Sequence, residues 1–150
     1  MMRTRSFRGA NALTALALLT GGLLAAGGGT SAAASPGDCA NWWSADGATN
    51  ARAARAMVIP GGRYDTLMYG NINGIQHAWS QYDGNTRTGE HGWMDVSWDG
   101  GRTWLQCGPF RVEYDGQTVR SKAFRTSNDP KVKVRSCDDA DGSIACTSWW

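Results

Sequence analysis

Proton transfer near neutral pH most often relies on histidine, and the chain contains two histidines. His77 lies in a run of residues typical of a strand, on the same face as Trp79. Asp95 lies in the next such run, and Glu90 is a further carboxylate close to it in sequence. A histidine beside a carboxylate and aromatic rings could act as a general acid or base on a glycan or a phosphodiester. A lone histidine on an aromatic strand face is more often packed and hydrogen-bonded, so His77, Asp95 and Glu90 form only an alternative, catalytic interpretation.

Two pairs of adjacent tryptophans, among eight in the chain, are candidates for ligand binding. They are Trp42-Trp43 and Trp149-Trp150. In an extended chain, neighbouring side chains point to opposite faces, so one ring of each pair could be buried while the other is exposed. Exposed indole rings stack on the apolar faces of sugars and mark binding surfaces. The alternative is that both pairs pack against the cysteines at the ends of the domain.

Basic side chains alternate along two late segments of the chain. Arg120 and Lys122 share one side of the first segment, and Lys131, Lys133 and Arg135 share one side of the second. If the two segments pair as strands, five cations come together and could bind an anionic polymer such as teichoic acid, an acidic polysaccharide or nucleic acid. The alternative is a solvated sheet face, or an edge strand whose lysines prevent aggregation.

The stretch 97–104, which reads SWDGGRTW, has the composition of a tight turn. Glycines permit a left-handed bend, and the carboxylate can accept backbone N–H bonds inside the loop. The pattern Ser-x-Asp-x-Gly-x-Thr-Trp resembles the Asp-box, a β-hairpin motif of sialidases, other glycan-active secreted proteins and certain secreted ribonucleases. Its consensus positions are Ser97, Asp99, Gly101, Thr103 and Trp104. The resemblance implies a structural turn away from any catalytic centre. The chain ends in Cys-Thr-x-Trp-Trp and is also similar to a class of small tryptophan-rich secreted proteins of actinomycetes with that ending.

The amino-terminal segment indicates secretion. It contains Arg3, Arg5 and Arg8 without any acidic residue, followed by an apolar run over 10–26 and small residues up to position 34. This is the pattern of a cleaved signal peptide over 1–34, which predicts an extracellular protein with one domain over 35–150 and no membrane anchor. Three of the 15 basic residues lie in the leader, so 12 remain against 13 acidic residues, a formal charge of −1. That charge argues against nucleic acid as a partner, and we expect a monomer.

Four cysteines follow the leader, at positions 39, 107, 137 and 146. An even number in a small secreted domain indicates two disulfides, and we favour Cys39 with Cys107 and Cys137 with Cys146 over the two other pairings. No C-x-x-C spacing supports zinc, and the acidic stretch 138–142 lacks the glutamate of a calcium-binding helix-loop-helix. The sequence therefore predicts no metal and no cofactor.

Turn signals at regular intervals predict an all-β fold, an antiparallel meander forming a sandwich or a small barrel. Asn73-Gly74 and Asp115-Gly116 are dipeptides favoured in two-residue hairpin turns, so each predicts a hairpin. An alanine-rich segment over 47–59, with Asn50 as a cap, predicts one short helix near the amino terminus.

Three functions are compatible with this sequence. The first is a secreted, non-enzymatic domain that binds a glycan or a cell-envelope polymer through exposed tryptophans. The second is a small hydrolase of glycans or RNA that uses His77 with a carboxylate. The third is a protein-binding or inhibitor domain, which would need a rigid loop braced by a disulfide.

Overall fold

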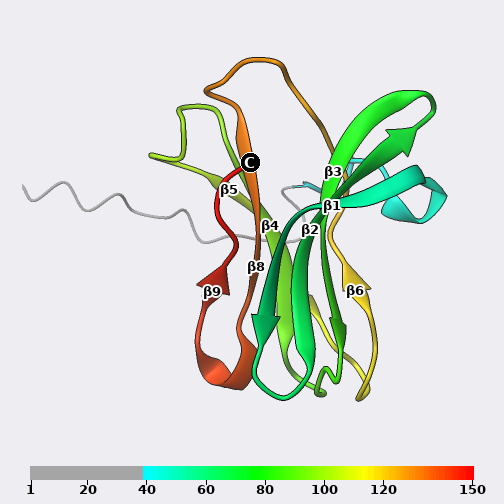
Figure 1. The fold of residues 1–150 in the computed structure, drawn as a ribbon, viewed down its shortest axis with the longest axis vertical. Helices are drawn as coiled ribbons and strands as arrows, with labels where there is room; N and C mark the ends of the chain where they lie inside the picture. The colour runs from blue at the N-terminus through cyan, green and yellow to red at the C-terminus, as the bar shows by residue number, and fades with distance from the viewer. Residues whose placement is uncertain (1–38) are drawn as a thin grey trace, which may run out of the picture.

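A computed structural model describes residues 39–150, which form two antiparallel β-sheets packed face to face (Figure 1). The predicted all-β fold is confirmed, and the observed architecture is the sandwich. The predicted signal peptide, residues 1–34, lies outside the described residues. Within the described part, no helix is long or apolar enough to cross a membrane.

The first sheet has the order β1-β2-β3-β6, and β7 also pairs with β3. Its strands are β1 (Thr49–Ile59), β2 (Arg63–Ile72), β3 (Ile75–Gly84), β6 (Val119–Arg120) and β7 (Phe124–Arg125). Asn73 and Gly74 join β2 to β3 with φ angles of 51° and 77°. The hairpin predicted there is confirmed, because both central residues of its turn have the positive φ that the tightest hairpins require.

The second sheet has the order β5-β4-β8-β9. Its strands are β4 (His91–Ser97), β5 (Leu105–Arg111), β8 (Lys133–Asp138) and β9 (Ala145–Cys146). The chain beyond β9 continues along β8, because Trp150 exchanges two backbone hydrogen bonds with Val134, of 2.9 and 3.2 Å. The C-terminal segment thus covers much of the β8 edge.

Alternating residues of both sheets form the core between them. Leu67 and Ala78 of the first sheet meet Met94, Val96 and Val134 of the second, and all five are buried. Burial of the four larger side chains among them stabilises the fold by roughly 1.5–3 kcal/mol each. Both favoured disulfides are confirmed, Cys39–Cys107 within this core and Cys137–Cys146 between β8 and β9.

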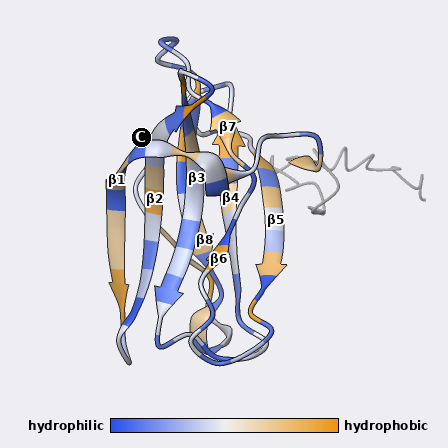
Figure 2. Ribbon diagram, turned by 90° about the vertical axis from the view of Figure 1, so that its right-hand side faces the viewer, coloured by the Kyte–Doolittle hydropathy of each residue, from blue (hydrophilic) through white to orange (hydrophobic). Residues whose placement is uncertain are grey.

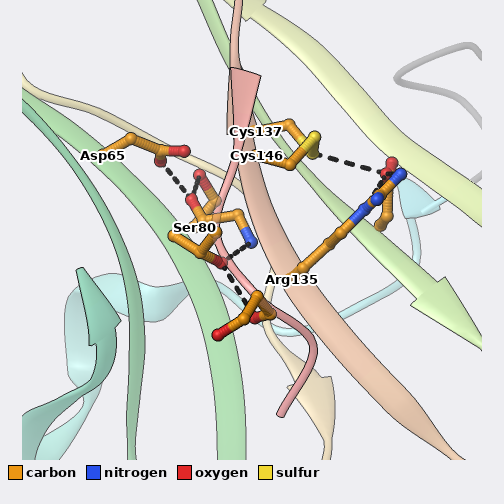
Figure 3. Close-up of a disulfide and its surroundings, with 9 residues drawn as sticks. Asp65, Ser80, Arg135, Cys137 and Cys146 are labelled. Carbon is orange, nitrogen blue, oxygen red and sulfur yellow. Dashed lines mark hydrogen bonds and ion pairs between the residues drawn. A yellow bond between two sulfur atoms is a disulfide. The ribbon is translucent and has the colours of Figure 1, made fainter. Parts of the chain in front are cut away.

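A polar cluster interrupts the apolar core. Ser136 of β8 donates a hydrogen bond to the buried carboxyl group of Asp65 on β2, and it lies 2.6 Å from the hydroxyl of Ser80 on β3 (Figure 3). Burial raises the pKa of Asp65 to about 8, and the nearby Asp138 adds to the shift. Asp65 is therefore uncharged over much of the pH range in which an ordinary aspartate is ionised.

Arg63 ties together the end of the sandwich opposite the 97–104 hairpin. Its side chain is almost completely buried and donates to Glu90, to Asp141 at 2.5 Å and to the carbonyl oxygen of Pro60 at 2.6 Å. The hydroxyl of Tyr82 donates to the same Glu90 at 2.7 Å. Burial alone would raise the pKa of Glu90, but these donors lower it, so a charged carboxylate is held here with its partners.

The helix predicted over 47–59 is wrong. Apart from a short 3-10 turn at Ala45–Gly47, this segment is strand β1, which Figure 2 shows as hydrophobic over much of its length. The preference of alanine for helices is small, and pairing with β2 along most of the strand outweighs it. Asn50 has a φ of 54° at an irregularity of the strand rather than a capping role.

The hairpin predicted at Asp115-Gly116 is also wrong, although the turn is present. Gln117 donates to the carbonyl oxygen of Tyr114 at 3.1 Å, and Gly116 has a φ of 79°. The strands on either side, β5 and β6, belong to different sheets. The turn therefore carries the chain from one sheet to the other.

Candidate functional site

The hairpin between β4 and β5 is organised by its own side chains. Asp99 accepts hydrogen bonds from the backbone N–H groups of Thr103 at 2.9 Å and Arg102 at 3.0 Å, and from the Thr103 hydroxyl at 2.8 Å. Ser97 donates to Asp99 at 2.8 Å and accepts from the N–H of Gly101 at 2.8 Å. The Thr103 bonds, chief among these contacts, lower the pKa of Asp99 to about 2. Its carboxylate is thus used to shape the loop.

A stacked Trp-Arg-Trp arrangement supports this hairpin from the outer face of the second sheet. The Arg135 guanidinium lies 4.7 Å from the ring centre of Trp104 and 4.4 Å from that of Trp149. It also pairs with Asp95 at 2.8 Å (Figure 3). Burial raises the pKa of Asp95 although Arg135 acts against the shift. Arg135, predicted to bind ligand, is therefore engaged with neighbouring side chains.

The most exposed aromatic ring of this region is Trp98, which the sequence analysis did not select. Its side chain is 51% exposed, and its ring lies edge-on to Phe124 at 5.8 Å. Met94, Val96 and Trp98 are spaced by two residues and therefore follow the same face of β4, but Trp98 lies one residue beyond the end of the strand. It therefore projects past the end of the core. The alternation was readable from the sequence, whereas the end of the strand was not.

Trp98 borders a surface groove of about 500 Å³, which Arg102 and Lys131 also line. A second groove of about 310 Å³ adjoins it at Pro130 and runs past Phe124 to Trp150. The N–H of Gly100 donates to the carbonyl oxygen of Lys131 at 2.8 Å, which holds the hairpin against the loop before β8. We name these two grooves together the Trp98 groove.

The four tryptophans predicted to bind ligand differ in exposure. Trp43 is 55% exposed, whereas Trp42, Trp149 and Trp150 are partly buried. Trp42 packs on Phe124 at 5.1 Å, and Trp150 packs on Tyr69 at 5.3 Å beside the core. The expected alternation is thus seen in Trp42-Trp43, while Trp149 and Trp150 contact opposite faces of the second sheet. Trp150 also lines the second of the two grooves.

The structure does not bring together the residues of the catalytic interpretation. His77 is buried, its Nδ1 lies 2.8 Å from the carbonyl oxygen of Ile75, and its ring lies edge-on to Trp43. On the first sheet, Ala78 faces the core, so its neighbour His77 faces outward. On the second sheet, Asp95 also faces outward. The two side chains therefore lie on opposite sides of the sandwich. Glu90 belongs to the Arg63 network.

The other histidine does have a carboxylate partner. His91 Nδ1 lies 2.7 Å from Asp139 Oδ2, and the His91 N–H donates to Asp139 Oδ1 at 2.6 Å. Both side chains are about 30% exposed. Because the residues are 48 positions apart, no local pattern in the sequence could have paired them.

The two basic segments do not pair with each other, so the condition for bringing their five cations together is not met. Arg120 lies in β6, which pairs with β3, whereas Lys133 and Arg135 lie in β8, which pairs with β4. The turn at 127–130 joins strands of different sheets, so the five cations separate into two groups. Lys131 and Lys133 line the Trp98 groove, and Lys122 lies with Arg120 elsewhere.

The molecule belongs structurally to the disulfide-bonded β-sandwiches, and it has a groove lined by aromatic and cationic side chains at one end. Comparisons of the chain with protein-family models, with curated proteins and with solved structures find no match. The function has to be inferred from the residues of this chain.

Proposed function

We propose that this protein is a secreted, non-enzymatic domain that binds a glycan or a cell-envelope polymer in the Trp98 groove. The observation that carries the proposal is a half-exposed indole ring, braced by Phe124, at the mouth of a groove that also holds Arg102 and Lys131. The two confirmed disulfides are compatible with an extracellular location.

The chemistry of the groove favours an acidic polysaccharide or a phosphate-containing wall polymer. A sugar ring can stack on the flat face of Trp98, while the two cations meet carboxylate or phosphate groups of the same chain. The adjoining groove, which extends past Phe124, provides room for further units of a polymer. The two side-chain carboxylates that line these grooves, Asp99 and Asp129, accept backbone N–H bonds within their own loops, so we favour binding without bond cleavage.

The first test is co-sedimentation of the purified mature protein with chitin, cellulose, xylan, and peptidoglycan with and without teichoic acid. Tryptophan fluorescence would be followed with soluble oligomers of the same polymers. We expect saturable binding, a fluorescence shift and no released product. No binding to any of these polymers would contradict the proposal.

A matched pair of variants locates the site. Trp98→Ala removes the ring at the groove, and Trp43→Ala removes a ring of nearly equal exposure, 55% against 51%, outside it. We expect Trp98→Ala to weaken binding by about tenfold or more, equivalent to about 1.4 kcal/mol. Trp43→Ala should leave the affinity unchanged. Equal losses in both variants would show that the Trp98 groove is not the site.

A small hydrolase is the second candidate function, favoured by the His91–Asp139 contact at 2.7 Å. A carboxylate on Nδ1 fixes the ring and leaves Nε2 for proton transfer. The test is release of products from RNA and glycans by the native protein and by His91→Ala. Activity that survives in His91→Ala would remove this candidate.

A further inference from the structure

A second cavity lies on the side of the sandwich where the edge strands β5 and β6 approach each other. It has a volume of about 380 Å³. Arg111 from the end of β5, Arg120 from β6 and Lys122 just beyond β6 line it, with Phe110 as an apolar wall. It shares no lining residue with the Trp98 groove, so it is a separate place on the molecule.

Positive charge predominates in the lining of this cavity. Three cations line it against one carboxylate, that of Asp46. Asp46 is 79% exposed and lies 3.6 Å from Arg120, and Glu113 outside the cavity is 62% exposed and lies 3.4 Å from Arg111. Exposed pairs of this kind are weak, typically about 0–1 kcal/mol. The guanidinium groups therefore keep most of their capacity to bind another anion.

The cations are partly held in place before any ligand arrives. The Nε–H of Arg120 donates to the side-chain oxygen of Gln81 at 2.8 Å, which orients one guanidinium at the rim. Ser121, between Arg120 and Lys122, is buried, and its hydroxyl accepts from the N–H of Ser80 at 2.9 Å. Anchoring this middle residue directs its two neighbours outward together.

Uncharged hydrogen-bonding groups complete the lining. Ser44, Gln117 and Thr118 border the same cavity. Guanidinium groups bind phosphate oxygens with two parallel N–H bonds, and a lysine adds a point charge. Hydroxyl and amide groups hydrogen-bond the hydroxyls of a sugar or polyol.

We infer that this cavity binds a phosphate group carried on a hydroxylated carbon chain, a sugar phosphate or polyol phosphate. The three cations neutralise the phosphate, and the Thr118 hydroxyl and the Gln117 amide contact the attached hydroxyls. The inference does not depend on the function of the Trp98 groove, because different residues form the two sites.

The experiment is a titration of the 15N-labelled protein, followed by NMR, with inorganic phosphate, glycerol phosphate and poly(glycerol phosphate). We expect saturable shifts in 44–46, 110–111 and 117–122, with tighter binding of glycerol phosphate than of inorganic phosphate. The polymer distinguishes a wall-polymer source from a free metabolite, because only a polymeric ligand would bind more tightly per phosphate than the monomer. Shifts confined to the Trp98 groove would overturn the inference, and equal affinities for phosphate and glycerol phosphate would overturn its polyol component.

Variants test the assignment. Arg120→Gln combined with Lys122→Gln should weaken glycerol phosphate binding at least tenfold, and Arg111→Gln alone should weaken it severalfold. Arg52→Gln makes the same change of charge on β1, the opposite edge of the first sheet, and should leave the affinity unchanged. An equal loss in Arg52→Gln, or no loss in the cavity variants, would overturn the site. An unchanged spectrum away from the substitution confirms that each variant is folded.

Discussion

Replacement of the buried Asp65 by asparagine should stabilise the protein at alkaline pH. In the folded protein the pKa of Asp65 is raised from 3.8 to about 8, chiefly by burial. An acid with a raised folded pKa holds its proton more tightly in the folded state than in the unfolded state. Its contribution to stability is therefore fully present below about pH 4 and is lost as the pH rises to about 8. Asparagine has nearly the same shape and does not titrate.

The size of this effect follows from the two pKa values. At about 1.36 kcal/mol per pH unit, the complete titration lowers the free energy of unfolding of the wild type by about 6 kcal/mol. This value is an upper bound, because water penetration and relaxation reduce the penalty of a buried charge. Between pH 5 and pH 9 the same relation gives about 4 kcal/mol. The variant should match the wild type near pH 4 and become progressively more stable above it.

Urea unfolding monitored by tryptophan fluorescence, with the disulfides intact, measures this difference at each pH. Glu113→Gln is the control for the replacement of a carboxylate by an amide, because it makes the same chemical change at an exposed side chain. Subtraction of wild type from variant cancels the other carboxylates, including Glu90 and Asp141, whose lowered pKa values favour the folded state at higher pH. A difference that does not change with pH, or a variant that is less stable at every pH, would refute the reasoning.

The remaining predictions concern the hairpin and the disulfides. Gly101→Ala should lower the free energy of unfolding by about 1–3 kcal/mol more than Gly100→Ala. Both glycines have a positive φ, but only at Gly101 would an added Cβ come within 2.9 Å of Trp149 Nε1. Calorimetry of the two variants would show no difference if this contact were unimportant. Each disulfide can be removed separately by replacing its two cysteines with alanine. The free energy of unfolding, measured in urea, should fall by about 4 kcal/mol without Cys39–Cys107, which spans 68 residues, and by about 3 kcal/mol without Cys137–Cys146, which spans nine. The reverse order would contradict the explanation by loop entropy. Asp99→Ala should lower the melting temperature, because its carboxylate holds the loop together. Its lowered pKa makes this contribution present above about pH 4 and lost toward pH 2, so a melting temperature equal to wild type at pH 6 would argue against its role in the loop.

Local patterns predicted those parts of the fold that local chemistry determines. The turn at Asn73-Gly74 needs positive φ at two residues, and the alternation of β3 and β4 needs only a period of two. The disulfide pairing was favoured because one bridge closes a short loop and the other ties the first segment to the middle of the chain. These inferences required no knowledge of which strands become neighbours.

The errors arose where the partner of a segment decides its structure. The alanine-rich β1 is a strand because β2 lies beside it, and β6 joins β3 rather than β8 although only 12 residues separate β6 from β8. The candidate site was missed for the same reason. Trp98 is exposed because β4 ends at Ser97, and Phe124 reaches it from the other sheet. Residue types identified the chemistry of the surface, while the packing of the two sheets determined which side chains meet.

If the Trp98 groove binds a polymer as proposed, the hydrogen bond from Gly100 to the carbonyl oxygen of Lys131 has a consequence for the kinetics of binding. Because it joins the backbones of the two loops that carry the indole ring and the lysine, it restricts the movement of one loop relative to the other before a ligand arrives. A ligand then loses little affinity to the ordering of the loops. Association should be limited by encounter and steered by the cations of the groove, so Trp98→Ala, which leaves the charge unchanged, would alter the residence time of the ligand far more than its rate of capture.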